Sequence, residues 1–417
     1  MNRFIGILGI FVLLGIAYLL SNNKKNIDIR LIVWGLGLQL LFGIFILVTP
    51  FGKPIFSWFD KVINKLLSFS HDGSSFLFAS FIDGKMHPAL INFAFYVLPT
   101  VIFFSALMSV LYNLGIMQKV ITVIAWIMQK TMKTSGPETT SISANIFVGQ
   151  TEAPLVIKPF IKKMTNSELM AVMTGGFATV AGGVMAIYVG MLQNIPGIAG
   201  HLMAASIMSA PAALVIAKIM YPEMNKDHIT TEINIEEDNN NKENILEALG
   251  NGATDGLKLA ANIAAMLIAF VALISLTNHL LGIFGTSLEI ILGYIFMPLA
   301  FCMGAPWSEA NILGSLLGQK LVVTELIAYQ NLSAMTVGIP LDGIIVPGVT
   351  YISEKTAILA SYALCGFANF ASIGIQLGGI GSIAPERKKD LAKLVTKAMF
   401  GGALASWLTA TIAGILI

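Results

Sequence analysis

Charged residues are scarce in this sequence. Only 12% of its 417 residues are Asp, Glu, Lys or Arg, whereas 56% are hydrophobic. Soluble domains carry about 25% charged residues, so this composition indicates a protein of the lipid bilayer rather than of water. The formal net charge of +2 is too small to indicate binding to nucleic acid, and we expect no nucleic-acid partner.

Cysteine and the usual catalytic motifs are nearly absent as well. The two cysteines, Cys302 and Cys365, lie in apolar segments without a C-x-x-C motif and are interpreted as packing residues. There is no H-E-x-x-H, G-x-S-x-G or Walker A motif, and the five histidines lack the spacing of metal ligands. We therefore expect a protein that is not an enzyme and that needs no organic cofactor.

Long apolar runs, in contrast, are abundant. A membrane-spanning helix needs ~17–25 mostly apolar residues, and about eight runs are long enough. The sequence therefore predicts an all-α integral membrane protein with about eight transmembrane helices. The predicted spans are Phe4–Leu20, Leu31–Val48, Ile91–Leu114, Leu169–Leu192, Ile198–Met220, Leu257–Leu281, Ala357–Gly381 and Ala398–Ile417.

Basic residues in the short loops predict the orientation. Four groups of Lys and Arg fall on one side of the membrane if both termini lie outside the cytoplasm, as the positive-inside rule requires. We therefore expect a multi-pass protein of the cell (inner) membrane, with a cytoplasmic linker over residues 221–248. The four groups are Lys24, Lys25 and Arg30; Lys158, Lys162 and Lys163; Lys218 and Lys226; and Arg387, Lys388 and Lys389.

Four segments do not fit plain spanning helices. Ser57–Phe69 and Ile116–Met132 are amphipathic and predict helices that lie in the membrane interface. Ser141–Lys163, broken at "GQTEAP", and Ile290–Tyr329, broken at "MGAPWSEA", have apolar arms too short to cross. They predict re-entrant hairpins, whose non-helical tips must face protein or a water-filled cavity.

The two halves of the chain also resemble each other. "GGFATVAGG" (175–183) and "CGFANFASIG" (365–374) each follow a predicted hairpin and a Ser-Glu pair suited to a helix start, Ser167-Glu168 and Ser353-Glu354. This order predicts inverted repeats with a site where they meet near mid-membrane. The expected parts are N-terminal scaffold helices (1–115), a first repeat (116–220), the linker (221–248), a scaffold helix (249–286) and a second repeat (287–417).

Four motifs together resemble the concentrative nucleoside transporters: "NIFVGQTEAP", "PWSEA", "ISEKT" and "CGFANFASIG". The resemblance covers essentially the whole chain, in order and spacing. It implies cation-coupled uptake of nucleosides, a homotrimer, and a mobile transport part that holds both hairpins against a scaffold. A channel would also place polar residues at depth, but it needs no inverted repeat of broken hairpins.

Two intramembrane glutamates, Glu152 and Glu325, are the strongest candidates for binding residues. A carboxylate facing lipid costs several kcal/mol, so each should face a polar cavity, where it would repel phosphate and favour nucleosides over nucleotides. The alternative for Gln150 and Glu152 is that they only close the backbone of the hairpin. For Asn369 and Ser372 the alternative is hydrogen bonding between helices.

The resemblance assigns these residues to the two ends of the substrate. It implies a nucleobase side formed by Gly149, Gln150, Thr151 and Glu152, with an apolar contact from Val184. The ribose, whose diol donates two hydrogen bonds, is expected at Glu325, with Asn369, Ser372 and Phe367 beside it.

The expected coupling ion is Na⁺. By resemblance, its ligands are the Asn145 side chain, the Thr179 hydroxyl and carbonyl, and the carbonyls of Val148 and Val180. The Thr179 hydroxyl has an alternative role, because it is able to bond back to its own helix. A proton-coupled nucleoside symporter remains the alternative function.

Overall fold

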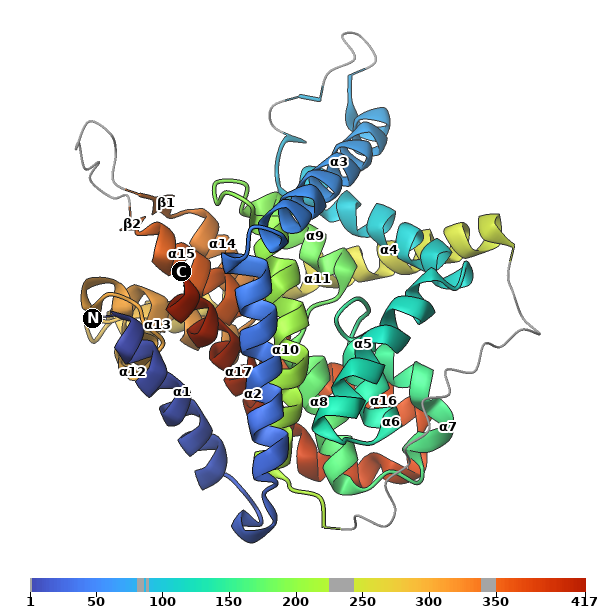
Figure 1. Ribbon diagram of the computed structural model, residues 1–417. Helices are drawn as coiled ribbons and strands as arrows, with labels where there is room; N and C mark the ends of the chain where they lie inside the picture. The colour runs from blue at the N-terminus through green and yellow to red at the C-terminus, as the bar shows by residue number, and fades with distance from the viewer. Residues whose placement is uncertain (1, 81–85, 88–89, 225–243, 339–349) are drawn as a thin grey trace.

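The computed structural model describes residues 2–80, 86–87, 90–224, 244–338 and 350–417 (Figure 1). Most of the predicted linker over 221–248 therefore lies outside the described residues. The described part is almost entirely helical, as predicted. Its named strands are β1 (Thr336–Val337) and β2 (Tyr351–Ile352), a short parallel pair that the sequence did not indicate.

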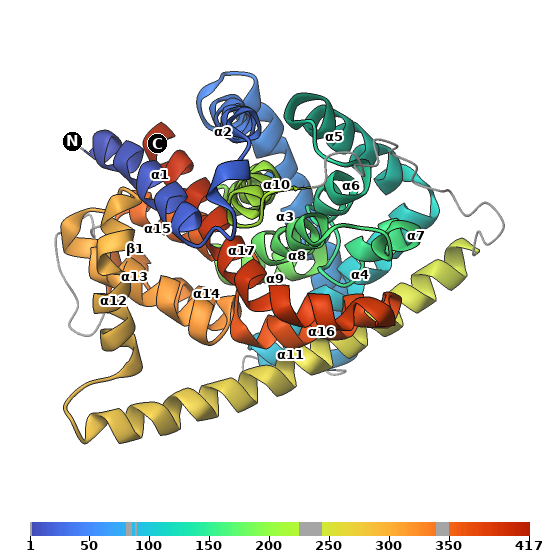
Figure 2. The same cartoon turned by 90° about the horizontal axis from the view of Figure 1, so that it is seen from below.

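The predicted scaffold helices include one that is much longer than its apolar run. They are α1 (Asn2–Leu19), α2 (Ile29–Gly43), α3 (Gly52–Phe78), α4 (Leu98–Asn113) and α11 (Ile245–Gly282). α11 runs along one edge of the molecule and packs against α4 (Figures 1 and 2). A Cβ at Gly252 of α11 would lie 2.8 Å from the Cα of Ala106, so glycine allows the two helices to approach closely.

The first repeat contains α5 (Ile116–Met132), the first hairpin with α6 (Gly136–Ala144) and α7 (Lys158–Ile161), the interrupted helix formed by α8 (Asn166–Ala178) and α9 (Gly182–Met191), and α10 (Ile198–Met220). The predicted helix Ile116–Met132 has the observed bounds of α5, whereas Ser57–Phe69 is only the middle of α3. The N-cap of α8 is Thr165, in a capping box with Glu168, so the predicted Ser167-Glu168 pair lies in the first turn of this helix.

The second repeat contains the same sequence of elements. Its helices are α12 (Leu288–Cys302), α13 (Trp307–Val322), α14 (Glu325–Ser333), α15 (Glu354–Leu364), α16 (Phe370–Ile383) and α17 (Lys388–Leu416). α12 and α13 meet at a bend of 118°, at the predicted "MGAPWSEA" break.

The bend thus lies where the sequence predicted the break, but a second break follows at Val323-Thr324, between α13 and α14, which the sequence analysis did not predict. Because Thr324 and Glu325 line the cavity described below, α13 and α14 are called the second hairpin here and Val323-Thr324 its tip. The two β-branched residues interrupt the helix without glycine or proline: Val323 has ψ near −94°, and Thr324 caps α14 by accepting a hydrogen bond from Ile327 N. Each hairpin tip therefore carries a Thr-Glu pair, Thr151-Glu152 and Thr324-Glu325.

Six helical stretches of the described residues are long and apolar enough to span a bilayer, or seven if α12 and α13 count as one bent span. Two of the eight predicted spans are shorter than expected. The first is apolar over Phe4–Leu19, and Ala357–Gly381 is divided into α15 and α16 by a break at residues 365–369. The molecule is therefore a helical membrane protein with fewer uninterrupted spans than predicted.

The two hairpins enter the molecule from opposite ends, as expected for inverted repeats. The start of α17 contacts the base of the first hairpin, because Arg387 donates hydrogen bonds to the carbonyls of Ile161 and Met164. The end of α17 contacts the base of the second hairpin, because a Cβ at Gly414 would lie 3.3 Å from the carbonyl oxygen of Met303. Since α17 is one continuous helix, the two bases lie at its opposite ends.

Candidate functional site

One cavity collects all nine predicted substrate residues. Its volume is about 450 Å³, within the range of ~300–1,000 Å³ that is usual for small-molecule sites. Both hairpin tips line it. So do the two places where a helix is interrupted, residues 179–181 between α8 and α9 and residues 365–369 between α15 and α16. The predicted residues in its wall are Gly149, Gln150, Thr151, Glu152, Val184, Glu325, Phe367, Asn369 and Ser372.

The first hairpin tip is closed by its own backbone. Oε2 of Glu152 accepts a hydrogen bond of 2.6 Å from Gly149 N, and a Cβ at Gly149 would lie 2.9 Å from that oxygen. A side chain at position 149 would therefore have to displace this carboxylate from its hydrogen bond. The backbone role weighed as an alternative for Glu152 is thus present, but the exposed side chain also lines the cavity.

Gln150 is oriented by a residue that sequence reasoning missed. Gln376 of α16 donates from Nε2 to Oε1 of Gln150 (3.1 Å) and to the carbonyl of Met173 (3.0 Å). The Gln150 amide nitrogen is therefore left as the donor of this side chain. Gly176 permits this contact, because a Cβ there would lie 2.5 Å from Nε2 of Gln376.

The second hairpin tip holds its carboxylate through other elements. Oε1 of Glu325 accepts a hydrogen bond from the Tyr188 hydroxyl (3.0 Å), and Oε2 accepts one from Nδ2 of Asn369 (2.5 Å). Oδ1 of Asn369 accepts from Ser372 N and so caps α16. Tyr188 lines the cavity and stacks on Tyr329, but it was not among the predicted residues.

The breaks of the two interrupted helices lie against each other. Gly366 has φ +102°, a conformation that favours glycine, and a Cβ there would lie 2.6 Å from the carbonyl oxygen of Phe177. The first break is also joined to the first hairpin, because Gly182 N donates to the carbonyl of Phe147. The structure thus brings Asn145 and Val148, near the hairpin tip, towards Thr179 and Val180.

These four residues suit a small cation. Asn145 is 1% exposed and donates from Nδ2 to the carbonyl of Ser141, while its Oδ1 accepts no hydrogen bond from any residue that the structure describes. A buried acceptor without a donor is costly unless a ligand satisfies it. The Thr179 hydroxyl donates to the carbonyl of Gly175 (2.9 Å), so it does bond to its own helix, with its oxygen lone pairs left to accept or coordinate.

α11 forms the remaining wall of the cavity, which the sequence analysis did not anticipate. Seven of its residues line the cavity: Leu259, Asn262, Ile263, Ala265, Met266, Leu267 and Phe270. The one signal was Asn262, a polar residue within a long apolar run, where such residues usually face protein or a cavity. A second cavity of about 460 Å³ shares Glu152, Val184 and Leu259 with the first and extends to Asp255.

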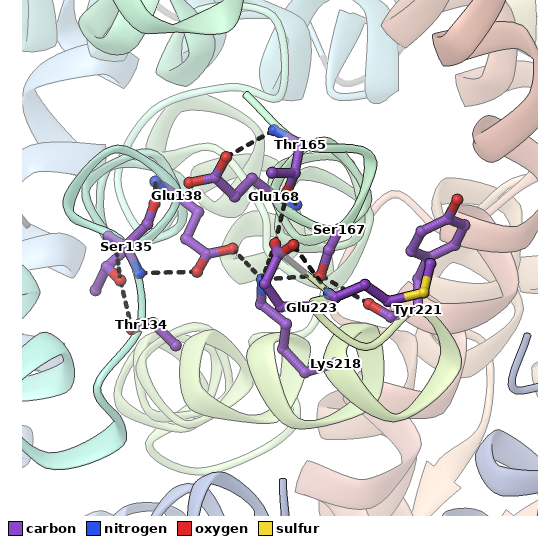
Figure 3. A network of polar contacts seen from close by, with 11 residues as sticks. Thr134, Ser135, Glu138, Thr165, Ser167, Glu168, Lys218, Tyr221 and Glu223 are labelled. Carbon is purple, nitrogen blue, oxygen red and sulfur yellow. Dashed lines mark hydrogen bonds and ion pairs between the residues drawn. The ribbon is translucent and has the colours of Figure 1, made fainter. Parts of the chain in front are cut away.

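A separate polar network lies at the base of the first hairpin (Figure 3). Nζ of Lys218 is 2.7 Å from Oε2 of Glu138 and 3.0 Å from Oγ of Ser167, and Thr165 donates to Oε2 of Glu223. Glu138 and Thr165 also belong to the capping boxes of α6 and α8. Because its groups bond to one another, we interpret this network as an anchor between α6, α8 and α10 and not as a ligand site.

Family models of transport proteins match three parts of the chain. They describe the "Na+ dependent nucleoside transporter C-terminus" at residues 201–414, the "Na+ dependent nucleoside transporter N-terminus" at 8–81 and "Nucleoside recognition" at 94–194. An uncharacterized transporter of Haemophilus influenzae is 45% identical over 99% of this chain and 97% of its own length. The sodium/nucleoside cotransporter 2 of Rattus norvegicus is 41% identical over 100% of this chain and 63% of its own length.

A solved structure has the same fold. The structure of CNTnw in an inward-facing substrate-bound state is 39% identical, covers 100% of this chain and 99% of that chain, and has a TM-score of 0.90.

Proposed function

The chain belongs to the family of Na⁺-dependent, concentrative nucleoside transporters, and we propose that it takes up nucleosides into the cell by symport with Na⁺. It is thus a multi-pass membrane transporter and not an enzyme. The observation that most supports the proposal is the single cavity bounded by both hairpin tips and both helix breaks. Access would alternate between the two ends of the molecule, as in other inverted-repeat transporters.

At the nucleobase end of the proposed site, called the base end below, side chains of the first hairpin tip form hydrogen bonds with the edge of the nucleobase. Gln150 presents its amide nitrogen as a donor, because Gln376 already donates to its oxygen. Glu152 offers an acceptor at the same tip, and Thr151 adds a hydroxyl. Val184 provides an apolar surface for the ring. Gly149 leaves room for the Glu152 carboxylate next to its own backbone N–H.

At the sugar end, Glu325 accepts hydrogen bonds from the ribose diol. Its two oxygens already accept bonds from Tyr188 and Asn369, which fix the plane of the carboxylate before substrate enters. Each oxygen retains further lone-pair capacity for a ribose hydroxyl. Ser372 and Phe367 complete this end of the cavity. A charged acceptor is the stronger partner for a diol and also repels a phosphate.

The proposed Na⁺ site uses the side chain of Asn145, the hydroxyl and carbonyl of Thr179, and the carbonyls of Val148 and Val180. The support for it is Oδ1 of Asn145, which accepts no hydrogen bond from the part of the chain that the structure describes, together with the end of α8 at Thr179, where carbonyls lack intrahelical donors. When bound, the ion would link hairpin and helix break, so that it favours the geometry that binds nucleoside. One Na⁺ moving inward gains ~2.3 kcal/mol per 100 mV of membrane potential.

We further propose a homotrimer in the cell (inner) membrane with both termini outside the cytoplasm. Residues 116–220 and 287–417 would form the mobile transport part, and 1–115 with 249–286 the scaffold. Gly6, near the start of the chain, packs against Ile415, near its end, so the termini share one end of the molecule. The basic residues Lys162 and Arg387 lie at the opposite end, which the positive-inside rule assigns to the cytoplasm.

Uptake of labelled uridine into proteoliposomes tests the function directly. At fixed pH, an inward Na⁺ gradient should drive accumulation, and replacing Na⁺ by choline should abolish it. Accumulation that persists in choline and follows an inward proton gradient would instead establish the proton-coupled alternative. The absence of any nucleoside uptake would contradict the proposal.

A further inference from the structure

Lys320 is a buried cation that the proposed mechanism does not use. It lies in α13, on the first arm of the second hairpin, and its side chain is 0% exposed. Its Nζ donates to the carbonyls of Ala363 (2.8 Å) and Cys365 (3.0 Å) and to Oγ of Ser406 (2.7 Å). Among the described residues, no carboxylate forms an ion pair with it.

Burial of this ammonium without a paired carboxylate is expensive. The effective penalty for taking one ion out of water is several kcal/mol, so its three acceptors must offset much of that cost. Two of them are carbonyls at the C-terminal end of α15, where the last carbonyls lack intrahelical donors and the helix dipole is negative. The lysine thus satisfies the end of the interrupted helix.

The first repeat has the same architecture but no such lysine. Its interrupted helix, α8, is capped by Thr179, and the first arm of its hairpin ends at Asn145, whose Oδ1 accepts no hydrogen bond from any described residue. Lys320 lies on the corresponding arm of the second hairpin, five residues before Glu325. A Gly-Phe-Ala triplet precedes the first break and lies within the second, and the two breaks pack against each other at Gly366.

We propose that Lys320 supplies, as a tethered ammonium, the cation that the second broken helix needs, whereas the first broken helix takes Na⁺ from solution. This inference rests on the proposed function. Lys320 is a positioning residue: it holds Cys365 at the start of the break that ends at Asn369, and Asn369 bonds to Glu325. The sugar end of the cavity is thereby kept assembled in every state of the ion cycle.

Substitution of Lys320 separates charge from packing. Lys320→Met keeps the length of the side chain but removes the ammonium, whereas Lys320→Arg keeps a cation. In proteoliposomes with measured amounts of protein, Lys320→Met should raise the KM for uridine at least tenfold and lower the preference for uridine over 2′,3′-dideoxyuridine by a similar factor. Lys320→Arg should retain more of that preference. The Na⁺ concentration for half-maximal uptake should change little, because the Na⁺ site is at the other break.

Lys218→Met is the matched control, since Lys218 is also a buried lysine but lies in the network at the base of the first hairpin (Figure 3). It should lower thermal stability without changing the preference for the ribose diol. If neither Lys320 variant folds, Ser406→Ala removes one of the three acceptors and should lower the preference for uridine over 2′,3′-dideoxyuridine in the same direction but by a smaller factor.

An unchanged sugar preference in Lys320→Met, equal behaviour of the Met and Arg variants, or an unchanged sugar preference in Ser406→Ala would overturn the inference. Absence of uptake by the unsubstituted protein would refute the proposed function instead.

Discussion

The two hairpin tips carry the same Thr-Glu pair but hold their carboxylates in different ways. Glu152 accepts a hydrogen bond from Gly149 N in its own hairpin, whereas Glu325 accepts from Tyr188 of α9 and Asn369 at the start of α16. The first arrangement forms wherever the hairpin folds. The second forms only when three elements assemble. The sugar end should therefore be more sensitive to substitution than the base end.

The two helix breaks differ in the same sense. The first leaves Oδ1 of Asn145 without a donor among the described residues. At the second, Lys320 donates to the carbonyl of Cys365. In the proposed mechanism, the first half of the site therefore gains and loses an ion, whereas the second half keeps a cation that is part of the chain. The predictions that follow test this division, beginning with the largest expected effect.

Glu325→Gln should have the largest effect on sugar recognition. It replaces one carboxylate oxygen by an amide NH2, which cannot accept a hydrogen bond from a ribose hydroxyl, so a charge-assisted bond worth ~1.5–3 kcal/mol is lost and the preference for uridine over 2′,3′-dideoxyuridine should fall about 10- to 100-fold. Competition of labelled uridine uptake by the two nucleosides measures this ratio. Glu152→Gln is the control and should leave it nearly unchanged. A full sugar preference in Glu325→Gln would show that the ribose does not bind there.

Substitutions at the proposed Na⁺ site should change the dependence on Na⁺ instead of sugar recognition. Asn145→Ala and Thr179→Ala should each raise the Na⁺ concentration for half-maximal uptake by about tenfold, because each removes one oxygen ligand. At saturating Na⁺ the affinity for uridine should recover. Ser143→Ala, on the same buried helix, is the matched control. If both variants kept the Na⁺ dependence of the unsubstituted protein, the ion would have to bind elsewhere.

The sequence predicted the helical membrane fold and nine residues of the cavity wall, but not the break at Val323-Thr324 or the residues that hold the cavity side chains in place. Apolar length identified the spans, and glycine with proline identified the first hairpin tip. The break at Val323-Thr324 was missed, because these β-branched residues also continue an apolar run. A break of this kind becomes evident only when Glu325 is seen to meet residues of two other elements.

Residues that act across the fold were also missed. Gln376 and Tyr188 bond to Gln150 and Glu325 over separations of more than 100 residues, so no local pattern connects them. The contribution of α11 to the cavity wall was missed for a different reason. Its apolar composition satisfies lipid and cavity equally well, and only Asn262 distinguishes the face that lines the cavity.

Substitutions at the base end should have smaller effects, and they should change the preference among nucleobases. Gln150→Ala should change the ranking of nucleosides with different bases by about 5- to 10-fold, because it removes neutral hydrogen bonds worth ~0.5–1.5 kcal/mol each. Gln376→Leu should reproduce part of this change, since it frees the Gln150 amide to rotate. The preference for the ribose diol should remain in both. Competition by a panel of purine and pyrimidine nucleosides is the measurement, and an unchanged ranking would argue against nucleobase contact at Gln150.

Tyr188→Phe tests whether Glu325 depends on its neighbours, and it should have the smallest effect of the four. The substitution removes one hydroxyl at 3.0 Å from Oε1 of Glu325 and preserves the stacking of the ring on Tyr329. Asn369 would still donate to Oε2 of Glu325, and a ribose hydroxyl or water is able to reach the freed Oε1. The carboxylate would therefore be less firmly oriented but would remain an acceptor for the ribose. We expect the preference for uridine over 2′,3′-dideoxyuridine to fall about two- to fivefold, with base ranking and Na⁺ dependence unchanged. In the double variant with Glu325→Gln, the effect of Tyr188→Phe should largely disappear, because two residues that act through one contact are not additive. Fully additive effects would show that Tyr188 contributes to transport independently of Glu325, and the carboxylate would then be positioned by its own hairpin, as Glu152 is.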